Sequence, residues 1–326
     1  GAGFIGSNFV DSLLRSDPSA KVTNLDAMTY AGVRSTADWL DRHSGHTFVR
    51  GDIRNRSLLD DVLPGHDVVI HFAAESHVDR SITGPLPFFE TNVVGTATLV
   101  DAAWKAGVPR FVHVSTDEVY GSIPHGFARE SATLNPTSPY ASSKAGSDLA
   151  VLSYYSTYGY DVIVTRSTNN FGPRQFPEKV IPLFVTNLLD GLSVPLYGKG
   201  EAERDWLHVD DHCSALAMIV ANGEAGEIYN VGANEQRRNI DLTETILQEC
   251  GADHTSIEYV EDRLGHVKFH QLTYPEKTGK IRHSSSLLHV VSDDDDGVVG
   301  FKCSHQFFDL HCGDGIKSRT GLVHED

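Results

Sequence analysis

The sequence of 326 residues has no apolar run long enough to span a bilayer, which takes about 18 residues or more, so we expect no membrane segment. Positive charge is scarce, because 27 Lys and Arg stand against 44 Asp and Glu, for a formal net charge of -17. Nucleic acids and anionic membranes attract clusters of Lys and Arg, so we expect neither as a partner. Any anionic substrate must therefore be met by local cations.

Cysteine is also rare, and the four Cys residues, at positions 213, 250, 303 and 312, have no close paired spacing. With no signal peptide visible, we expect reduced thiols in a cytoplasmic protein. Cys303, His305, His311 and Cys312 are zinc-ligand types. They lack the usual loop spacing of zinc sites, so we predict no metal site.

The chain opens on GAGFIG, a GxGxxG pattern of Gly1, Gly3 and Gly6, and a helical spacing of apolar residues follows. The segment VTNLD predicts a strand that ends in Asp26, twenty residues after Gly6. In dinucleotide-binding α/β folds, a carboxylate at this place binds the ribose hydroxyls and repels a 2′-phosphate. The pattern therefore favours NAD over NADP. The alternative is a glycine-rich turn with an exposed Asp.

Phe4 and Ile5 complete this glycine loop and belong to the predicted cofactor site. In this fold a central strand leads into the loop, and no such strand stands ahead of Gly1. We therefore expect the native chain to have about eight further residues there, roughly one strand's length.

Further strand and helix repeats predict a doubly wound parallel α/β sheet of the Rossmann type over residues 1–166, followed by a smaller domain over 167–266. The strand HTFVRGDI ends in Asp52 and Ile53, which suit the edge and face of adenine. The strand DVVIHFAAES ends in Ala73 and Ala74, small residues that allow close approach of a cofactor or pack against a helix.

The reaction is predicted at FVHVSTDEVYG, residues 111–121, where an apolar strand is followed at once by Thr116, Asp117 and Glu118. Ligands of open α/β sheets bind beyond the carboxyl ends of the strands, so these side chains are well placed to meet a substrate. The alternative is a helix N-cap followed by a first-turn acid.

Tyr140 and Lys144 are spaced i, i+4 in PYASSKAGSD, so both lie on one face of a helix that begins just after Pro139. A lysine beside a phenol lowers the phenol pKa. We therefore expect Tyr140 to act as a base toward a hydroxyl near neutral pH.

The smaller domain begins with NNFGPRQFPEK, a loop rich in Asn, Gly and Pro. Asn169 suits hydrogen bonds to sugar hydroxyls or a diphosphate, while Glu178 and Lys179 bring charge to the same mouth. Arg204 suits a bidentate phosphate contact, the alternative being a surface ion pair with a neighbouring Asp. Farther along, Asn239 is a candidate helix cap and Arg263 a second cation.

The segments GAGFIGSNFV, HFAAESHVDRSI, STDEVYG, SPYASSKAGSD, NNFGPRQFPEK and RDWLHVDDHC together resemble the nucleotide-sugar 4,6-dehydratases of the extended short-chain dehydrogenase/reductase superfamily. The resemblance runs from residue 1 to about residue 266. It implies an NAD-dependent lyase acting on a nucleotide-linked glucose, and a homodimer formed through helices near 88–106 and 140–157.

The resemblance also implies a mechanism. Tyr140, held by Lys144 and assisted by Thr116, would take the proton of the glucose 4-hydroxyl while hydride passes from C4 to NAD. Glu118 would then remove the C5 proton, and Asp117 would protonate the departing 6-hydroxyl, so that water is lost before hydride returns to C6. To act as the acid, Asp117 must have a raised pKa, which we expect from its carboxylate neighbour and from burial.

The resemblance further implies nucleotide-sugar contacts from Asn169, Lys179, Arg204 and Asn239, with Arg263 near the phosphates. The sequence does not decide whether the substrate carries thymidine or uridine, because the two bases differ by one methyl group. A nucleotide-sugar epimerase or decarboxylase that uses the same tyrosine, or an inactive nucleotide-binding member, stay open as alternatives. Residues 267–326 depart from the family pattern, and we expect either a frameshifted or fused tail or a variant ending.

Overall fold

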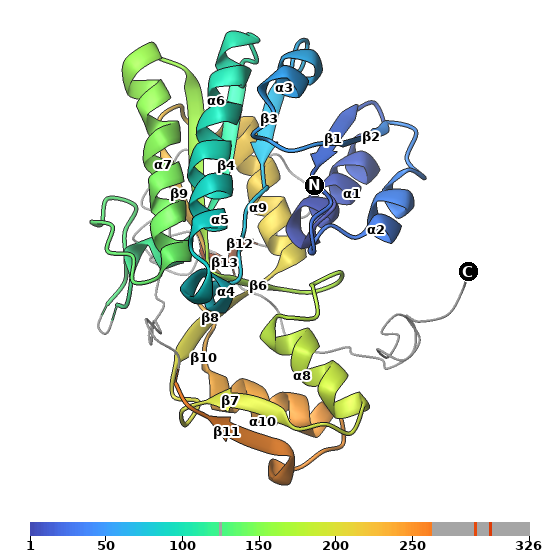
Figure 1. The fold of residues 1–326 in the computed structure, drawn as a ribbon, viewed down its shortest axis with the longest axis vertical. Helices are drawn as coiled ribbons and strands as arrows, with labels where there is room; N and C mark the ends of the chain where they lie inside the picture. The colour runs from blue at the N-terminus through green and yellow to red at the C-terminus, as the bar shows by residue number, and fades with distance from the viewer. Residues whose placement is uncertain (124–125, 263–289, 292–299, 302–326) are drawn as a thin grey trace.

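The computed structural model describes residues 1–123 and 126–262, together with two short paired strands, β12 (Val290–Val291) and β13 (Gly300–Phe301). Its centre is a four-stranded parallel sheet with the strand order β3-β4-β5-β9 (Figure 1). The strand bounds are Val68–His71 for β3, Arg110–Thr116 for β4, Asp161–Ser167 for β5 and Ile228–Val231 for β9.

The middle strands of this sheet are apolar on both faces, because helices cover both. On β4, Phe111 packs in one cluster with the helices α3 (Arg56–Val62), α6 (Thr96–Lys105) and α7 (Pro139–Tyr158). The next residue, Val112, packs in another with α9 (Val209–Asn222). Successive side chains of a strand point to opposite faces of the sheet, and helices cover both faces here, so neighbouring residues such as Phe111 and Val112 are both buried. The predicted doubly wound α/β fold is confirmed.

A second parallel pair, β1 (Val22–Asp26) with β2 (His46–Arg50), lies beside the main sheet, next to the helices α1 (Phe4–Ser16) and α2 (Arg34–Leu40). A cavity of about 190 Å³ lies between this pair and β3. Apolar side chains of α1, β1 and β3 line it. The strand predicted ahead of residue 1 stays a prediction.

The helix predicted over residues 87–106 is present but is interrupted. It consists of α5 (Leu86–Phe88), a π-helical segment η1 (Phe89–Gly95) and α6. Asn92 is buried in the π-helical segment, where it accepts from Glu75 N and donates to Glu75 O and Ser143 Oγ, each within 2.9 Å. These bonds tie the helix to the loop after β3. The short helix α4 (Val78–Thr83) follows that loop.

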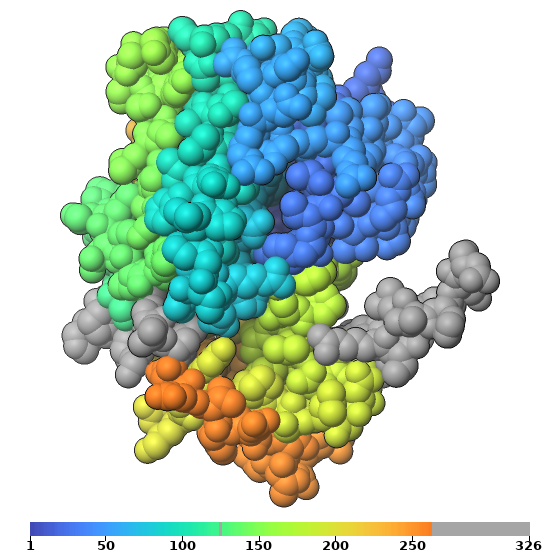
Figure 2. All heavy atoms as spheres, in the orientation of Figure 1, coloured from blue at the N-terminus to red at the C-terminus, as the bar shows by residue number. Residues whose placement is uncertain are grey.

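The second lobe is built from short strands and two helices, and it lies below the first lobe in Figures 1 and 2. Its three-stranded sheet has the order β10-β8-β6, and a parallel pair β7-β11 stands beside it. The bounds are Asn169–Phe171 for β6, Val194–Tyr197 for β7, Glu203–His208 for β8, Gln236–Arg238 for β10, Ile257–Val260 for β11, Val180–Leu189 for α8 and Asn239–Glu249 for α10, with a short 3-10 helix η3 at His254–Ser256.

After β8 the chain returns to the first lobe through α9 and β9 before it enters the second lobe again, so the lobes are interleaved in sequence. The division of the chain at residue 166 stays a prediction. Among the helices that the structure describes, none is both long and apolar enough to cross a membrane.

Candidate active site

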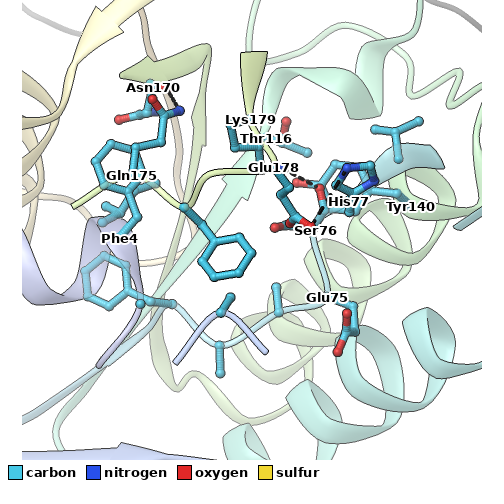
Figure 3. A pocket seen from close by; sticks show the side chains of 18 of the residues that line it. Phe4, Glu75, Ser76, His77, Thr116, Tyr140, Asn170, Gln175, Glu178 and Lys179 are labelled. Atoms are coloured by element: carbon cyan, nitrogen blue, oxygen red, sulfur yellow. Dashed lines mark hydrogen bonds and ion pairs between the residues drawn. The ribbon is translucent and has the colours of Figure 1, made fainter. Parts of the chain in front are cut away.

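A cavity of about 740 Å³ lies where the carboxyl ends of β1, β3, β4 and β5 face the second lobe. It is lined by residues from both lobes, and Figure 3 shows Phe4, Asn170 and Gln175 at one side of it and His77, Glu178 and Tyr140 at the other. The predicted site residues among its lining are Gly1, Gly3, Phe4, Ile5, Gly6, Asp26, Asp52, Ile53, Ala73, Ala74, Thr116, Glu118, Tyr140, Lys144, Asn169, Glu178, Lys179, Arg204 and Asn239.

The glycine loop brings the N-terminus of α1 to this cavity. Gly3 is the N-cap of α1, no side chain caps the helix, and no acidic residue stands in its first turn. The first amides and the helix dipole are therefore directed at the cavity without a side-chain cap or a first-turn acid on α1, which suits a diphosphate. A Cβ on Gly6 would lie 2.9 Å from Gly1 Cα, so the close packing of this turn requires glycine.

The carboxylate of Asp26 lies at the end of β1 beside this loop. Its Oδ2 accepts from Ala2 N over 2.8 Å, and its Oδ1 accepts from Met28 N over 2.8 Å. Oδ2 also accepts from Gly1 N over 3.0 Å, so it is Oδ1 that has a further lone pair with which to accept from a ribose hydroxyl. Its negative charge disfavours a 2′-phosphate at the same place.

The wall predicted for adenine is formed by Asp52 and Ile53, but Asp52 is engaged. Arg54 Nη2 lies 2.7 Å from Asp52 Oδ2, an ion pair that the sequence pattern did not indicate. Ile53 is buried, and Ala73 packs against the same core cluster. Packing and close approach therefore both explain the small residue at Ala73.

The predicted catalytic residues come from the end of β4 and from the start of α7. A short 3-10 helix, η2 (Asp117–Tyr120), follows β4 directly. Thr116 is its N-cap and accepts from Glu118 N over 3.2 Å, while its hydroxyl donates to Asp117 Oδ1 over 3.2 Å. Both acids therefore lie in the first turn after an N-cap, as the alternative interpretation predicted. This position is also compatible with a catalytic role.

The two acids differ in their position. Glu118 lines the cavity, whereas Asp117 is 3% exposed and, in the described part of the chain, is not among the lining residues. Asp117 is held directly behind Thr116, which does line the cavity. The role of Asp117 as an acid stays a prediction.

Tyr140 and Lys144 stand one turn apart on α7, whose first turn is capped by Ser138. Burial raises the pKa of the Tyr140 phenol, the Glu118 carboxylate adds to this, and a hydrogen bond with Thr116 opposes it. The expectation that the pKa of Tyr140 is lowered is therefore not met, because burial and the Glu118 charge raise it. Lys144 Nζ instead donates to Val114 O over 2.9 Å.

The side of the cavity in the second lobe carries the predicted substrate-binding residues. Arg204 is 5% exposed and donates from Nη1 to Glu203 O over 2.7 Å, so it is not part of a surface ion pair. Lys179 Nζ donates to Ser76 O over 3.1 Å. Asn169 begins β6 and Asn239 begins α10. Arg263 and the tail 267–326 with its Cys and His residues lie outside the described residues, apart from the backbone of the two short strands.

Glu178 is paired across the mouth of the cavity, which the sequence did not indicate. Its Oε2 lies 2.8 Å from Arg80 Nη2 and 3.9 Å from His77 Nε2 (Figure 3 shows His77 and Glu178). Its charge is thus largely matched by Arg80 from α4. This arrangement favours a role in joining the two lobes over direct contact with an anion.

The cavity has further polar lining residues that the sequence did not indicate, among them Gln175 and Tyr197. Gln175 donates from Nε2 to Asn170 O over 2.9 Å, and the Tyr197 hydroxyl lies 3.2 Å from Asp79 Oδ2. Tyr197 ends the strand β7, so the rule that marks strand ends was available for it. It was missed because β7 belongs to the second lobe and not to the main sheet. Within residues 1–123 and 126–262, no three metal-ligating side chains converge on one point.

Comparison with known proteins places these features in context. The family model described as GDP-mannose 4,6 dehydratase matches residues 1–280. The chain is 51% identical over 287 residues to a dTDP-glucose 4,6-dehydratase of Actinoplanes sp., which covers 86% of this chain and 89% of that protein.

Solved structures agree with the sequence comparison. The crystal structure of DesIV, a dTDP-glucose 4,6-dehydratase from Streptomyces venezuelae with NAD and TYD bound, is 52% identical with a TM-score of 0.84 and covers 87% of this chain and 90% of that one. The dTDP-glucose 4,6-dehydratase of Bacillus anthracis in complex with NAD is 45% identical with a TM-score of 0.77, covering 83% and 85%.

Proposed function

The chain belongs to the GDP-mannose 4,6 dehydratase family of nucleotide-sugar dehydratases, and from this we propose that it converts dTDP-glucose to dTDP-4-keto-6-deoxyglucose as an NAD-dependent hydro-lyase. One observation carries the proposal. Thr116, Glu118, Tyr140 and Lys144 line the same cavity as the open N-terminus of α1. Tyr140 as a base, the Glu118 carboxylate and a dinucleotide site thereby face one cavity.

The cofactor is NAD, and the residues of the first lobe fit it. The amides at the start of α1 would hold the diphosphate, and Asp26 would hold the adenosine ribose hydroxyls. Asp52 and Ile53 would lie against the adenine, while Ala73 and Ala74 would leave room for the dinucleotide. When bound, NAD supplies a hydride acceptor for C4 of the sugar and later a hydride donor for C6.

The first task of the chain is to remove the proton of the 4-hydroxyl. Tyr140 does this from α7, and the Thr116 hydroxyl beside it orients the phenol. Tyr140 can accept this proton only as a phenolate, so the phenol must first give its own proton to solvent water. Because burial and Glu118 favour the protonated phenol, the charge of Lys144 one turn away is needed to stabilise the phenolate before it takes the 4-hydroxyl proton. The product of this step is a 4-ketone, which acidifies the C5 proton.

The second task is elimination of water across C5 and C6. Glu118 lines the cavity and takes the C5 proton, while Asp117, behind Thr116, gives a proton to the departing 6-hydroxyl. The C5 proton and the hydroxyl leave, and the proton from Asp117 completes the water molecule. Epimerisation at C4 needs no acid for a leaving hydroxyl, so this acid pair favours the dehydratase over an epimerase.

The nucleotide part of the substrate meets the second lobe. Arg204 is the best candidate for the diphosphate, because it is buried and lines the cavity. Lys179 would add a second positive charge, and Asn169 and Asn239 would bond the sugar or the phosphates. Arg263 is proposed to lie near the phosphates from the sequence resemblance alone.

We also propose that the protein is a homodimer in the cytoplasm. Two apolar side chains point outward from the helices expected at the interface: Val94 in η1 is 56% exposed and Leu149 in α7 is 61% exposed. Packing these helices against those of a second copy would bury them. Cys213 is a free thiol, which suits a reducing compartment.

The test of the function is direct. The purified chain is given dTDP-glucose or UDP-glucose with NAD, and formation of the 4-keto-6-deoxy sugar is followed by its absorbance in alkali. We expect product with dTDP-glucose and a much lower kcat/KM with UDP-glucose. Turnover of neither sugar, with NAD and the nucleotide sugar both bound, would overturn the proposal in favour of an inactive binding protein.

A further inference from the structure

A fully buried polar network lies next to Lys144, outside the cavity lining. Its members are His113 on β4, Ser147 and Asp148 on α7, and Arg166 on β5, and each is at most 2% exposed. None of them was singled out by the sequence, and none has a part in the reaction steps above. Buried charges at this depth are uncommon unless they serve one another or a neighbouring group.

The hydrogen bonds around His113 define its state. Its Nε2 lies 2.9 Å from Ser147 Oγ, and that hydroxyl donates to Lys144 O over 2.7 Å. The same Nε2 also lies 3.4 Å from Lys144 Nζ, so His113 contacts both Ser147 and the Lys144 ammonium through this nitrogen. Burial, with the charge of Lys144 added, lowers the pKa of His113 to about 4, so the ring is neutral. His113 thus separates Lys144 from Asp148 without contributing a charge.

Asp148 uses its two oxygens differently. Oδ2 lies 2.9 Å from Arg166 Nε, Oδ1 lies 3.5 Å from His113 Nε2, and a hydrogen bond from the Ser115 side chain also stabilises the carboxylate. Burial raises the pKa of Asp148, but the His113 contact and the charges around it outweigh this, so the pKa is lowered and the carboxylate stays ionised. One face of the anion is therefore paired and the other is directed toward His113 and the Lys144 side.

Lys144 and Asp148 are one helical turn apart on α7, a spacing at which opposite charges attract. Burial lowers the pKa of Lys144 to about 8, and the charge of Asp148 opposes this effect. Without Asp148, a buried ammonium ion would lose its proton more readily. The remaining titratable groups around the two residues are His71 from β3, Glu118 and Tyr120 from η2, Glu130 from the loop after η2, and Tyr140 from α7.

Arg166 is the cation that pairs with Asp148 on the side away from His113. Its Nη1 lies 2.7 Å from the Tyr120 hydroxyl, which in turn donates to Asn230 Oδ1 over 2.8 Å. This chain of bonds fixes the guanidinium against Asp148 Oδ2. The share of the Asp148 charge that acts on Lys144 depends on how much Arg166 neutralises.

We propose that Asp148 is a positioning residue for the dehydration, whose carboxylate keeps the buried Lys144 ammonium charged beside Tyr140, and that Arg166 sets how strongly it does so. The proposal rests on the function proposed above, because it assigns Asp148 a part in forming the Tyr140 phenolate. The proposal predicts that replacing Asp148 lowers the pKa of Lys144, whereas replacing Arg166 raises it.

The experiment compares the pH profile of kcat for wild type, Asp148→Asn and Arg166→Gln. For Asp148→Asn we expect the alkaline limb to move to lower pH by about one unit, with kcat near pH 8 reduced roughly fivefold and KM nearly unchanged. For Arg166→Gln we expect the limb to move to higher pH. Asp148→Glu should recover part of the loss.

The control is Asp161→Asn. Asp161 pairs with Arg110 over 2.9 Å at the other end of β4 and β5, so its loss should lower the melting temperature without moving the pH profile. The proposal would be overturned if the alkaline limb of Asp148→Asn lay at the same pH as that of wild type. It would also be overturned if Asp148→Asn and Arg166→Gln moved the limb in the same direction. If Asp148→Asn does not fold, the direction of the shift in Arg166→Gln decides the question.

A second readout does not depend on turnover. The Lys144 Cε carbon shift in protein labelled at lysine Cε, assigned with Lys144→Met, titrates with the amine, and Asp148→Asn should lower the midpoint. Wild type that fails to turn over dTDP-glucose would overturn the proposed function alone. An unchanged Lys144 midpoint in Asp148→Asn would overturn the present inference alone.

Discussion

Arg80 Nη2 lies 2.8 Å from Glu178 Oε2, and this ion pair joins α4 of the first lobe to the loop before α8 of the second. Lys179, next to Glu178, donates to Ser76 O over 3.1 Å and so makes a second link between the same segments. The Arg80 guanidinium also stacks 3.9 Å over the Tyr30 ring. Contacts made by the Arg80 and Lys179 side chains therefore join the two lobes at the edge of the cavity.

We predict that Arg80→Gln raises KM for the nucleotide sugar several-fold and leaves kcat within about twofold, because the loop that carries Lys179 is held less firmly. The Arg80 side chain is 48% exposed, so the ion pair contributes no more than about 1 kcal/mol to stability and the melting temperature should barely change. Steady-state kinetics and thermal melting check this.

The matched control for Arg80 is Arg34→Gln. Arg34 pairs with Asp38 over 2.8 Å on α2, and neither residue lines the cavity. Its kinetic constants should equal those of wild type. An unchanged KM in Arg80→Gln would show that the pair has no part in holding the substrate.

We predict that replacing either of the two acids after β4 blocks the elimination of water but leaves the oxidation at C4. Asp117→Asn and Glu118→Gln should both still oxidise C4, because Tyr140 and Lys144 are intact, but elimination should slow by about a hundredfold or more. Reduced nicotinamide should therefore accumulate in a single turnover, which its absorbance reports. Unchanged turnover of Asp117→Asn would remove the assignment of Asp117 as the acid, and its buried position behind Thr116 makes this the more exacting of the two variants.

The local parts of the site were predictable from the sequence because they depend on neighbours in the chain. The GxGxxG turn, the strand before Thr116 and the helical spacing of Tyr140 and Lys144 are each set by a few adjacent residues. The parallel sheet then brings strand ends together at one edge. That rule alone collects most of the cavity lining.

The remaining features depend on which distant segments meet. The Arg80 and Glu178 pair joins residues 98 positions apart, and no local pattern marks it. The pKa of Tyr140 was mispredicted for the same reason, because burial and the position of Glu118 follow from the folded cavity. The π-helical segment around Asn92 was also invisible, since its apolar spacing is helical and the extra residue is accommodated only by packing.

We predict that stability falls steeply in mild acid because three histidines are fully buried. Burial lowers the pKa of His71 well below its ordinary value, that of His113 to about 4 and that of His212 to about 3. The unfolded chain binds protons near pH 6.5, where the folded chain does not, so stability is complete above that pH and is lost below it. Each buried histidine lowers the free energy of unfolding by about 1.4 kcal/mol for each pH unit below about 6.5. At about pH 5.5 the three together lower it by about 4 kcal/mol.

Urea unfolding at several pH values measures this loss. His212→Gln should reduce the pH dependence by about a third, because one of three equivalent protons is removed. His254→Gln is the control, since the His254 side chain is 69% exposed and its replacement should leave the slope as in wild type. A flat stability between pH 8 and pH 5.5 would contradict the buried neutral histidines.

We predict that Leu149→Asp gives a monomer. Leu149 is 61% exposed on α7, and a carboxylate in the centre of the proposed four-helix interface would have no partner. Size exclusion with light scattering at micromolar concentration should show a dimer for wild type. Leu192→Asp, an equally exposed apolar position in the second lobe, should stay dimeric. A monomeric wild type would remove the proposed interface.

The central claim is that one hydride leaves C4 of the sugar and returns to C6 of the same molecule, beside Tyr140 and the acid pair. The most direct measurement uses dTDP-glucose that carries deuterium at C4 and locates the label in the product by mass spectrometry. The account predicts a 4-keto-6-deoxy sugar with the deuterium at C6. A sugar that keeps its 6-hydroxyl with the label still at C4, as an epimerase would give, would contradict it.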